Sequence, residues 1–244
     1  MDDFLKLKNK RILVTGASSG IGRATAIALS KQGAQVVLVG RDQERLEQTM
    51  LSLEKNTHSS IVADLTDYAS YEQIFERACE GGKLEGLVHC AGIVDVIPSK
   101  VVSYEKMLNV FQINFFAFME LVRYFTKRRF SDGGNIVAVS ALSAHQGRKG
   151  MSVYSASKGA IEAAVRSLAI ELIDKGFRVN AVVPGPVATP MASNSEKTFG
   201  FAVQENPSLG IALPEDVANT IMYLLSDVSR FVTGRNCYID GGRI

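Results

Sequence analysis

Short runs of apolar residues alternate along the chain with longer stretches in which apolar residues recur every three or four positions. The short runs are rich in β-branched residues and nearly continuous in apolar residues, which is typical of strands covered on both faces. They predict strands at Arg11–Thr15, Gln35–Gly40, Ser60–Ala63, Gly86–Cys90, Asn135–Ser140, Phe177–Val183 and Cys237–Ile239. The longer stretches predict helices at Ile21–Lys31, Gln43–Leu53, Tyr68–Cys79, Tyr104–Arg128, Ser152–Asp174 and Glu215–Leu225. This alternation predicts an α/β fold: a Rossmann-like, doubly wound sheet of about seven parallel strands with helices on both faces.

The chain shows no sign of a boundary between domains. It contains no linker rich in Pro, Gly or Ser, no repeat and no low-complexity tract. We therefore expect a single domain that spans residues 1–244. Three prolines, Pro184, Pro186 and Pro190, break the chain directly after the sixth predicted strand. The periodicity then disappears, which predicts a substrate loop or lid near residues 190–213.

The composition fits a globular protein of a reducing compartment. Of the 244 residues, 46% are hydrophobic and 21% charged, so the chain can bury a sizeable core. A net charge of +2, without a long Lys/Arg run, argues against nucleic acid or a membrane surface as partner. Cys79, Cys90 and Cys237 are widely spaced and odd in number, which disfavours a disulfide framework. With no signal-peptide pattern and no apolar run of roughly 20 residues, these features predict a cytoplasmic location.

Three glycines follow the first predicted strand and lead into the first predicted helix. Gly16, Gly20 and Gly22 would let the backbone turn tightly and approach a pyrophosphate, whose charge rests on the helix N-terminus. Their spacing differs from the usual G-x-G-x-x-G, and the Gly-Lys-Ser/Thr end of a P-loop is missing. A plain glycine-rich turn is the alternative. The position after the first strand of an alternating chain favours a dinucleotide site.

The end of the second predicted strand bears on the choice of dinucleotide. An acidic side chain there would bond a ribose 2′-hydroxyl, whereas an arginine can pair with a 2′-phosphate. Gly40 stands where the acid is expected and Arg41 follows it. We therefore expect NADP(H) to be favoured over NAD(H). In the alternative, Arg41 is a solvated residue of a helix cap led by Asp42.

Tyr154 and Lys158 lie four residues apart in a predicted helix, so both side chains share one helical face. A phenol has an unperturbed pKa of about 10 and needs help to exchange protons near neutrality. A neighbouring ammonium favours the phenolate and would bring that pKa toward the working pH. The pair therefore predicts an acid–base site. In the alternative, Tyr154 is an amphipathic helix residue with a packed ring and a wet hydroxyl.

Six motifs in this order resemble the short-chain dehydrogenase/reductase family in its single-domain, classical form. The motifs are Thr15–Gly22, Asp64 after the third strand, His89–Gly92 in place of the usual Asn-Asn-Ala-Gly, Asn114, Pro184–Thr189, and Val232–Gly242. The last is similar to the ending of bacterial 3-oxoacyl-acyl-carrier-protein reductases. The resemblance covers essentially the whole chain.

The resemblance implies a nicotinamide-dependent oxidoreductase. Hydride would pass from the nicotinamide to a carbonyl carbon while Tyr154 protonates the oxygen. Lys158 would tune Tyr154 and bind the nicotinamide ribose, and Asn114 would anchor a water that links Lys158 to solvent. The implied cofactor-binding residues are Gly16, Ser18, Ser19, Gly20, Ile21, Gly22, Arg41, Asp64, Leu65, Cys90, Ala91, Gly92, Tyr154, Lys158, Pro184, Gly185, Val187 and Thr189.

The catalytic serine of the family has no direct counterpart, because its usual position is Ala141. Ser143 lies two residues later and is favoured over Ser140, which should point to the other face of its strand. In a third alternative no serine serves, and His145 either replaces the donor or is merely solvated. Losing such a hydrogen bond costs roughly 10²–10³ in rate. A catalytically weak or silent NADP(H)-binding sensor or scaffold is therefore the second hypothesis.

The substituted Asn-Asn-Ala-Gly segment suggests structural roles. Cys90 fits a small buried residue, and His89 fits a hydrogen-bonding substitute for asparagine. No His, Cys or acidic residues stand at the spacing of a metal site, so we expect no metal.

The expected substrate pocket is mostly apolar. Its predicted lining is Val94, Val96, Leu142, Ala144, Met191, Phe199 and Phe201. This favours a hydrophobic or acyl-chain ketone, and the resemblance suggests a 3-oxoacyl thioester carried on acyl carrier protein or CoA. In the alternative, Phe199 and Phe201 only pack the lid down. Wide apolar stripes on the helices Tyr104–Arg128 and Ser152–Asp174 predict a homotetramer or homodimer, with full burial inside one subunit as the alternative.

Overall fold

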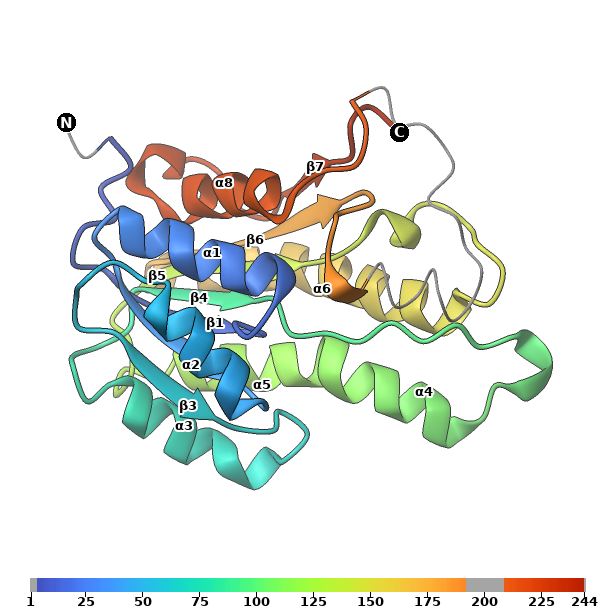
Figure 1. Cartoon of the computed structure of the whole chain (residues 1–244), viewed down its shortest axis with the longest axis horizontal. Coiled ribbons are helices and arrows are strands. Elements are labelled where there is room, and N and C mark those ends of the chain that lie inside the picture. The colour runs from blue at the N-terminus through green and yellow to red at the C-terminus, as the bar shows by residue number, and fades with distance from the viewer. Residues whose placement is uncertain (1–3, 192–208, 244) are drawn as a thin grey trace.

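The computed structural model describes residues 4–191 and 209–243. Its centre is a seven-stranded parallel sheet with the strand order β3-β2-β1-β4-β5-β6-β7 (Figure 1). The strands are β1 (Arg11–Thr15), β2 (Gln35–Gly40), β3 (Ser59–Val62), β4 (Gly86–His89), β5 (Gly134–Val139), β6 (Phe177–Pro184) and β7 (Asn236–Ile239). The predicted fold class, a single Rossmann-like α/β domain, is confirmed.

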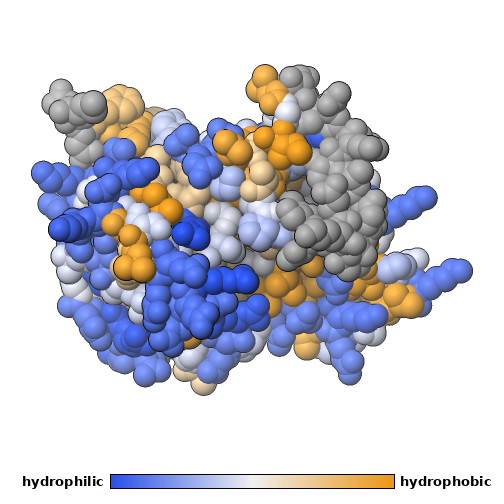
Figure 2. All heavy atoms as spheres, in the orientation of Figure 1, coloured by the Kyte–Doolittle hydropathy of each residue, from blue (hydrophilic) through white to orange (hydrophobic). Residues whose placement is uncertain are grey.

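Helices cover both faces of this sheet (Figure 1). They are α1 (Gly20–Lys31), α2 (Gln43–Leu51), α3 (Tyr71–Ala78), α4 (Tyr104–Phe111), α5 (Ala117–Phe125), α6 (Ser152–Leu172) and α8 (Pro214–Leu225). Short 3₁₀ segments lie at Tyr68–Ser70, Ser99–Val101, Leu142–Ala144, Ile173–Lys175 and Asp227–Ser229. Over α2 and α3, the surface in Figure 2 is predominantly hydrophilic, as expected where amphipathic helices turn their polar sides to solvent.

Two hydrophobic cores form because successive strand residues point to opposite faces of the sheet. Leu13 and Val37 pack with α3, α5 and α6 on one face. Ile12 and Val36 pack with α1, α2 and α8 on the other face. Strands buried on both faces explain the nearly continuous apolar runs of the sequence.

Most boundaries agree with the sequence within one or two residues, and the main difference lies in the predicted helix Tyr104–Arg128. It ends at Phe125 and is interrupted by a π-helical turn at Gln112–Phe116. Wide turns of this kind are often found at functional sites. Here the turn carries Asn114, whose side chain bonds the backbone of Ile93. A uniform 3.6-residue period cannot show such a local widening.

The parallel strands all end at one edge of the sheet, and the loops that follow them form the site. The predicted lid near 190–213 is described only at its two ends, because residues 192–208 lie outside the described part. At these ends Val187 and Ala212 form a parallel bridge. In the described residues, no helix is both long enough and apolar enough to cross a membrane.

Candidate active site

The glycine turn forms a close cradle at the start of α1. Gly16 has a φ of 65°, and a Cβ there would lie 2.7 Å from the backbone nitrogen of Ala91. A Cβ on Gly22 would collide with the Gly16 carbonyl. Ser19, the N-cap of α1, makes no capping hydrogen bond with its side chain, so the first amides of the helix are left for another acceptor. The turn therefore suits an anionic group such as a pyrophosphate.

A cavity of 590 Å³ runs from this turn along the ends of β2 and β3. Arg41 lines it, and its positive charge helps to lower the pKa of Asp64, after the larger contribution of the Thr66 backbone amide. The Asp42 carboxylate caps α2 through the Arg45 amide and pairs with the Arg45 guanidinium at 3.2 Å. Asp42, the acidic side chain nearest the end of β2, is thus already engaged by its own helix.

A second cavity of 260 Å³ adjoins the first and shares Ile21, Cys90, Gly92, Thr189 and Met191 with it. Every predicted cofactor-binding residue lines one or both cavities. The residues that fit a dinucleotide are therefore brought together in one continuous cleft, although they come from segments far apart in the sequence.

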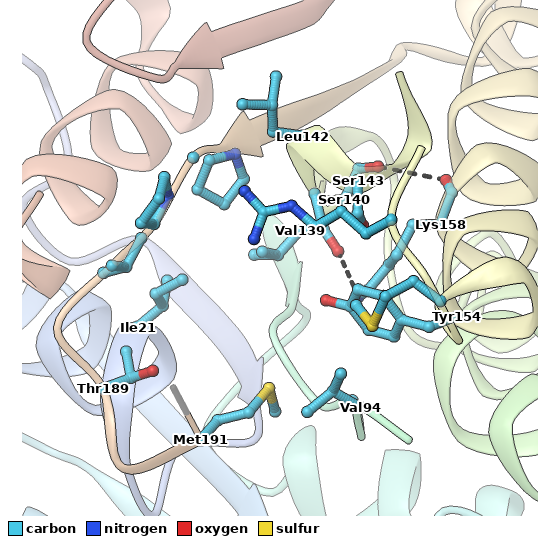
Figure 3. A pocket seen from close by; sticks show the side chains of 18 of the residues that line it. Ile21, Val94, Val139, Ser140, Leu142, Ser143, Tyr154, Lys158, Thr189 and Met191 are labelled. Atoms are coloured by element: carbon cyan, nitrogen blue, oxygen red, sulfur yellow. Dashed lines mark hydrogen bonds between the residues drawn. The ribbon is translucent and has the colours of Figure 1, made fainter. Parts of the chain in front are cut away.

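Tyr154 and Lys158 form one wall of the smaller cavity, opposite Ile21, Thr189 and Met191 (Figure 3). The Lys158 Nζ lies 5.9 Å from the centre of the Tyr154 ring and donates a hydrogen bond of 2.8 Å to the Val139 carbonyl. Burial lowers the pKa of Lys158 to about 8 and raises the pKa of Tyr154 to about 12. In the absence of a bound coenzyme the phenol therefore holds its proton, which is the form that a proton donor needs.

Asn114 is buried behind this wall. Its Oδ1 accepts from the Ile93 amide at 2.9 Å, and its Nδ2 donates to the Ile93 carbonyl and to the Ser157 hydroxyl. A Cβ on Gly92 would lie 3.1 Å from the Asn114 Oδ1 and 3.3 Å from the Lys158 Nζ. Asn114 and Lys158 thus face the same small space, and the predicted water between them stays a prediction.

The two candidate serines differ in what their hydroxyl groups bond. Ser140 donates to the Glu162 carboxylate at 2.6 Å and to the Lys158 carbonyl at 3.2 Å. The Ser143 Oγ is buried and has no hydrogen-bond partner within the described residues. Both serines and Ala141 line the cavity with Tyr154. Of the two serines, only Ser143 therefore has a hydroxyl without a hydrogen-bond partner among the described residues, in the cavity that Tyr154 also lines.

A buried carboxylate that sequence reasoning missed lies one helical turn beyond Lys158. Glu162 is 3% exposed and, besides the Ser140 hydroxyl, binds His145 at 2.7 Å and Asn236 at 2.8 Å. Tyr238 in turn bonds the His145 ring at 3.1 Å. His145 is thus held by Glu162 rather than merely solvated. The spacing Tyr154, Lys158, Glu162 along one helical stripe was the signal that could have revealed this cluster.

His89 is buried and hydrogen-bonded as the sequence suggested, whereas Cys90 is half-buried and lines both cavities rather than lying in the core. The His89 Nδ1 lies 3.0 Å from the Thr15 hydroxyl, which also accepts from the Ala91 amide. Burial lowers the pKa of His89 to about 3 and raises the pKa of the Cys90 thiol to about 12, so both are neutral near pH 7. Across residues 4–191 and 209–243, no group of three or more His, Cys, Asp or Glu could hold a metal ion.

The remaining walls of the smaller cavity are mostly apolar. Of the predicted pocket residues, Val94, Val96, Leu142 and Met191 line it, Ala144 lines a neighbouring cavity, and Phe199 and Phe201 lie outside the described residues. The sequence missed Met151, Gln146 and Arg148, which also line the cavity. These three belong to a loop without periodicity, where a residue's direction cannot be deduced from its position.

Comparisons with known proteins match this chain over nearly its whole length. A family model described as enoyl-(acyl carrier protein) reductase matches residues 16–243. The 2,3-dihydro-2,3-dihydroxybenzoate dehydrogenase of Escherichia coli (strain K12) is 34% identical over 98% of both chains. The 3-oxoacyl-acyl-carrier-protein reductase FabG of Thermotoga maritima is 32% identical over 98% of this chain and 100% of its own. A variant of actinorhodin polyketide ketoreductase, solved with NADPH, has a TM-score of 0.89 at 27% identity and covers 96% of this chain and 97% of its own.

Proposed function

Because the chain belongs to the short-chain dehydrogenase/reductase family of NAD(P)-dependent oxidoreductases, which act on C=O and CH–OH groups, we propose that it uses NADPH to reduce a ketone to a secondary alcohol. One observation carries the proposal. The cavity that holds Tyr154, Lys158 and Ser143 opens into the glycine-lined cavity through shared residues. A substrate carbonyl and a dinucleotide can therefore meet beside the phenol.

The protein's own groups divide the work on the substrate oxygen. A bound reduced nicotinamide supplies the hydride that the carbonyl carbon accepts. The Ser143 hydroxyl donates a hydrogen bond that holds the carbonyl oxygen, and the Tyr154 hydroxyl delivers the proton. Lys158 keeps a positive charge near the phenol, which stabilises the phenolate left after the proton has gone. The apolar walls exclude water and so strengthen these interactions.

Arg41 is the reason for proposing NADP(H) rather than NAD(H). It lines the larger cavity at the end of β2, where Gly40 leaves no acid for a ribose 2′-hydroxyl. Asp42 is engaged with the start of α2 and with Arg45. The Arg41 guanidinium can therefore pair with a 2′-phosphate at this end of the cleft, because the neighbouring Asp42 carboxylate is already bonded within α2.

The substrate and the assembly follow from weaker observations. The mostly apolar cavity supports an acyl-chain ketone, with a 3-oxoacyl thioester on acyl carrier protein or CoA as our first candidate. The relatives include a 2,3-dihydro-2,3-dihydroxybenzoate dehydrogenase and a 3-oxoacyl-acyl-carrier-protein reductase, so the fold cannot choose among substrates. Exposed apolar side chains on α4 support a homotetramer or homodimer. Three free cysteines are consistent with a cytoplasmic location.

The test follows NADPH oxidation with a panel of ketones that includes acetoacetyl thioesters. We expect turnover with at least one ketone, and a loss of activity in Tyr154→Phe by roughly 10²–10⁴-fold because the proton donor is gone. Nicotinamide fluorescence should respond to NADPH more than to NADH, and it should respond equally in Tyr154→Phe. Activity that survives in this variant would remove Tyr154 from the mechanism. NADPH binding without any turnover would favour the catalytically silent module that Ala141 suggested.

A further inference from the structure

One loop separates the cavity with Tyr154 from a neighbouring cavity of 620 Å³. Ser143, Gln146 and Arg148 line both cavities, whereas Lys149 lines only the outer one. Arg148 therefore lies at the boundary between the reaction site and the space through which a longer substrate would extend.

Among the described residues, the charged side chains that line these two cavities are cationic, apart from the ionisable ring of His145. No Asp or Glu lines either cavity in the part of the chain that the structure describes. Lys158 is the other cation of the inner cavity, and its ammonium already donates to the Val139 carbonyl. Within the same part of the chain, the Arg148 side chain makes no hydrogen bond or ion pair. Within residues 4–191 and 209–243, Arg148 thus brings a positive charge without a partner to a cavity that is otherwise mostly apolar.

Two acidic residues close to the inner cavity do not line it. Asp95 lies between the lining residues Val94 and Val96 but does not itself line the cavity. The Glu162 carboxylate is engaged by Ser140, His145 and Asn236. Arg148 is itself exposed, so solvent partly screens its charge, and its place on the wall shared by the two cavities is what would bring a substrate anion to it.

The backbone that carries Arg148 is held in place on both sides. Gln146 donates to the Arg243 carbonyl at 3.2 Å, and the Ile97 amide donates to the Gly150 carbonyl at 2.8 Å. Gly150 has a φ of 75°, and a Cβ there would lie 2.6 Å from the Val96 side chain. The Met151 amide donates to the Arg148 carbonyl, and α6 begins at the next residue. The backbone position of Arg148 relative to α6, which carries Tyr154, is therefore defined by the fold.

We infer that Arg148 selects the substrate by an anionic oxygen group, a carboxylate or a phosphate, which it binds while the ketone carbonyl lies at Tyr154. A guanidinium presents two parallel donors that match either group. The inference rests on the proposed function, because it names the substrate class of the same site. Two sources of the anion fit: the carboxylate of an oxo acid, or the phosphate of a CoA-type arm that extends into the outer cavity.

The experiment compares matched anionic and neutral ketones. Acetoacetate and levulinate are each paired with their methyl ester, and acetoacetyl-CoA is paired with acetoacetyl-N-acetylcysteamine. The values of kcat and KM are measured for wild type, Arg148→Met, Arg148→Lys and Lys149→Met. The last variant is the matched control, because it removes one charge from the same loop but not from the inner cavity.

We expect Arg148→Met to raise KM for the anionic member of a pair by roughly 10- to 100-fold, with little change in kcat and little effect on the neutral member. Arg148→Lys should recover part of the loss, and Lys149→Met should leave the inner preference unchanged. An effect confined to the oxo acids identifies a carboxylate, and an effect confined to the CoA pair identifies a phosphate. An unchanged ratio of anionic to neutral substrate in Arg148→Met, or an equal effect of Lys149→Met on the oxo acids, would overturn the inference.

A second measurement keeps this result separate from the proposed function. Calorimetric titration of levulinate and its methyl ester, with NADP⁺ present, needs no turnover. Wild type should bind the acid more tightly than the ester, and Arg148→Met should lose this preference. If no ketone is reduced, the proposed function fails, but the calorimetry still shows whether Arg148 binds an anion. Equal binding of the acid by both proteins contradicts that site, whatever the activity.

Discussion

At the scale of single residues, the choice of the serine that donates to the substrate oxygen depends on the hydrogen-bond partners of the two candidate hydroxyl groups. Ser140 shares a face of β5 with Ala138, toward α6, and its hydroxyl is bonded there to Glu162. Ser143 follows in the 3₁₀ segment, and its buried hydroxyl has no partner in the described residues. A buried donor without a partner costs free energy, which a substrate oxygen in the cavity would recover. Ala141 removed the usual donor, and Ser143 offers another from the next turn.

Replacement of Ser143 is the first prediction. Ser143→Ala should lower kcat/KM by roughly 10²–10³, because one donor to the developing oxyanion is lost. Ser140→Ala should act mainly on stability, since its hydroxyl serves Glu162. The double change Ser143→Ala with Ala141→Ser should recover part of the rate by returning a hydroxyl to the usual position. Steady-state kinetics with the best ketone of the panel measures all three, and an undiminished rate in Ser143→Ala would show that Ser143 is not the donor.

The ionisation of Lys158 gives the second prediction. Burial lowers the pKa of this ammonium to about 8. Below that pH it is charged and favours release of the Tyr154 proton, and above it the charge is lost. We therefore expect kcat/KM for reduction to fall above about pH 8, by up to roughly tenfold per pH unit. Lys158→Met should be nearly inactive and should show no such step. A wild-type profile that stays flat to about pH 10 contradicts this role.

The same group should appear in the stability of the protein without any substrate. The pKa of Lys158 is about 8 in the folded chain against 10.5 for the free group, so the unfolded chain binds more protons between these values. The Lys158 contribution to the free energy of unfolding should then rise with pH from about 8 to 10, while the raised pKa of Cys90 acts in the opposite direction above its free value of 9.0. Tyr154 has a raised pKa and acts in the opposite direction only above its free value of 10.0. Urea unfolding of wild type and Lys158→Met, followed against pH, isolates the lysine contribution as the difference in slope.

At the scale of elements, α6 connects Tyr154 and Lys158 to the rest of the fold. Tyr154, Lys158 and Glu162 follow one another at intervals of four along its inner stripe. The Glu162 carboxylate joins this helix to the end of β5 through Ser140, to the following loop through His145, and to β7 through Asn236. It therefore braces the segment that carries Ser143.

The third prediction removes this brace. Glu162→Ala should lower the free energy of unfolding by roughly 2–4 kcal/mol, because three hydrogen-bonding groups lose a buried acceptor. Glu162→Gln should cost less, since its amide oxygen can still accept from one of them. Glu171→Ala on the exposed side of the same helix is the control and should change stability by less than about 0.5 kcal/mol. Chemical denaturation measures the series, and equal stabilities of the alanine variants would show that the brace contributes nothing.

The sequence predicted those features that leave a local pattern. The strands and helices were found because apolar periodicity is local, and the cofactor cleft because its residues follow strand ends that meet at one edge. Glu162 and Asn236 lie 74 residues apart, and Gln146 and Arg243 lie 97 apart. Contacts between such distant residues have no periodic signature, so the spacing along α6 could point to Glu162 but not to its distant partner Asn236. The sequence did not predict the π-helical turn for another reason: the turn changes the backbone spacing by a single residue within a continuous apolar pattern.

At the scale of the whole molecule, α4 carries neighbouring apolar side chains that the cores leave exposed. Tyr104 is 73% and Met107 is 38% exposed there, whereas the exposed Ile170 of α6 stands on a helix whose other apolar residues are largely buried. Phe116, on the adjoining π-helical turn, is also 38% exposed. These side chains follow one another along the same stretch of chain, and clustered apolar exposure of this kind marks association surfaces. In the proposed homodimer or homotetramer, a second copy of the chain would cover these side chains.

The fourth prediction tests whether this face holds subunits together. Met107→Glu should reduce the molar mass measured by size-exclusion chromatography with light scattering, because burying an unpaired carboxylate in an apolar interface is costly. Leu51→Glu is the matched control: Leu51 is 87% exposed on α2, away from α4, so the same change there should leave the mass unaltered. Far-ultraviolet circular dichroism should be unchanged in both variants, since neither side chain belongs to a buried core. A monomeric wild type removes the proposed assembly altogether. An oligomer that survives Met107→Glu places the contact on another face, and an equal loss of mass in both variants would mean that added charge alone drives dissociation.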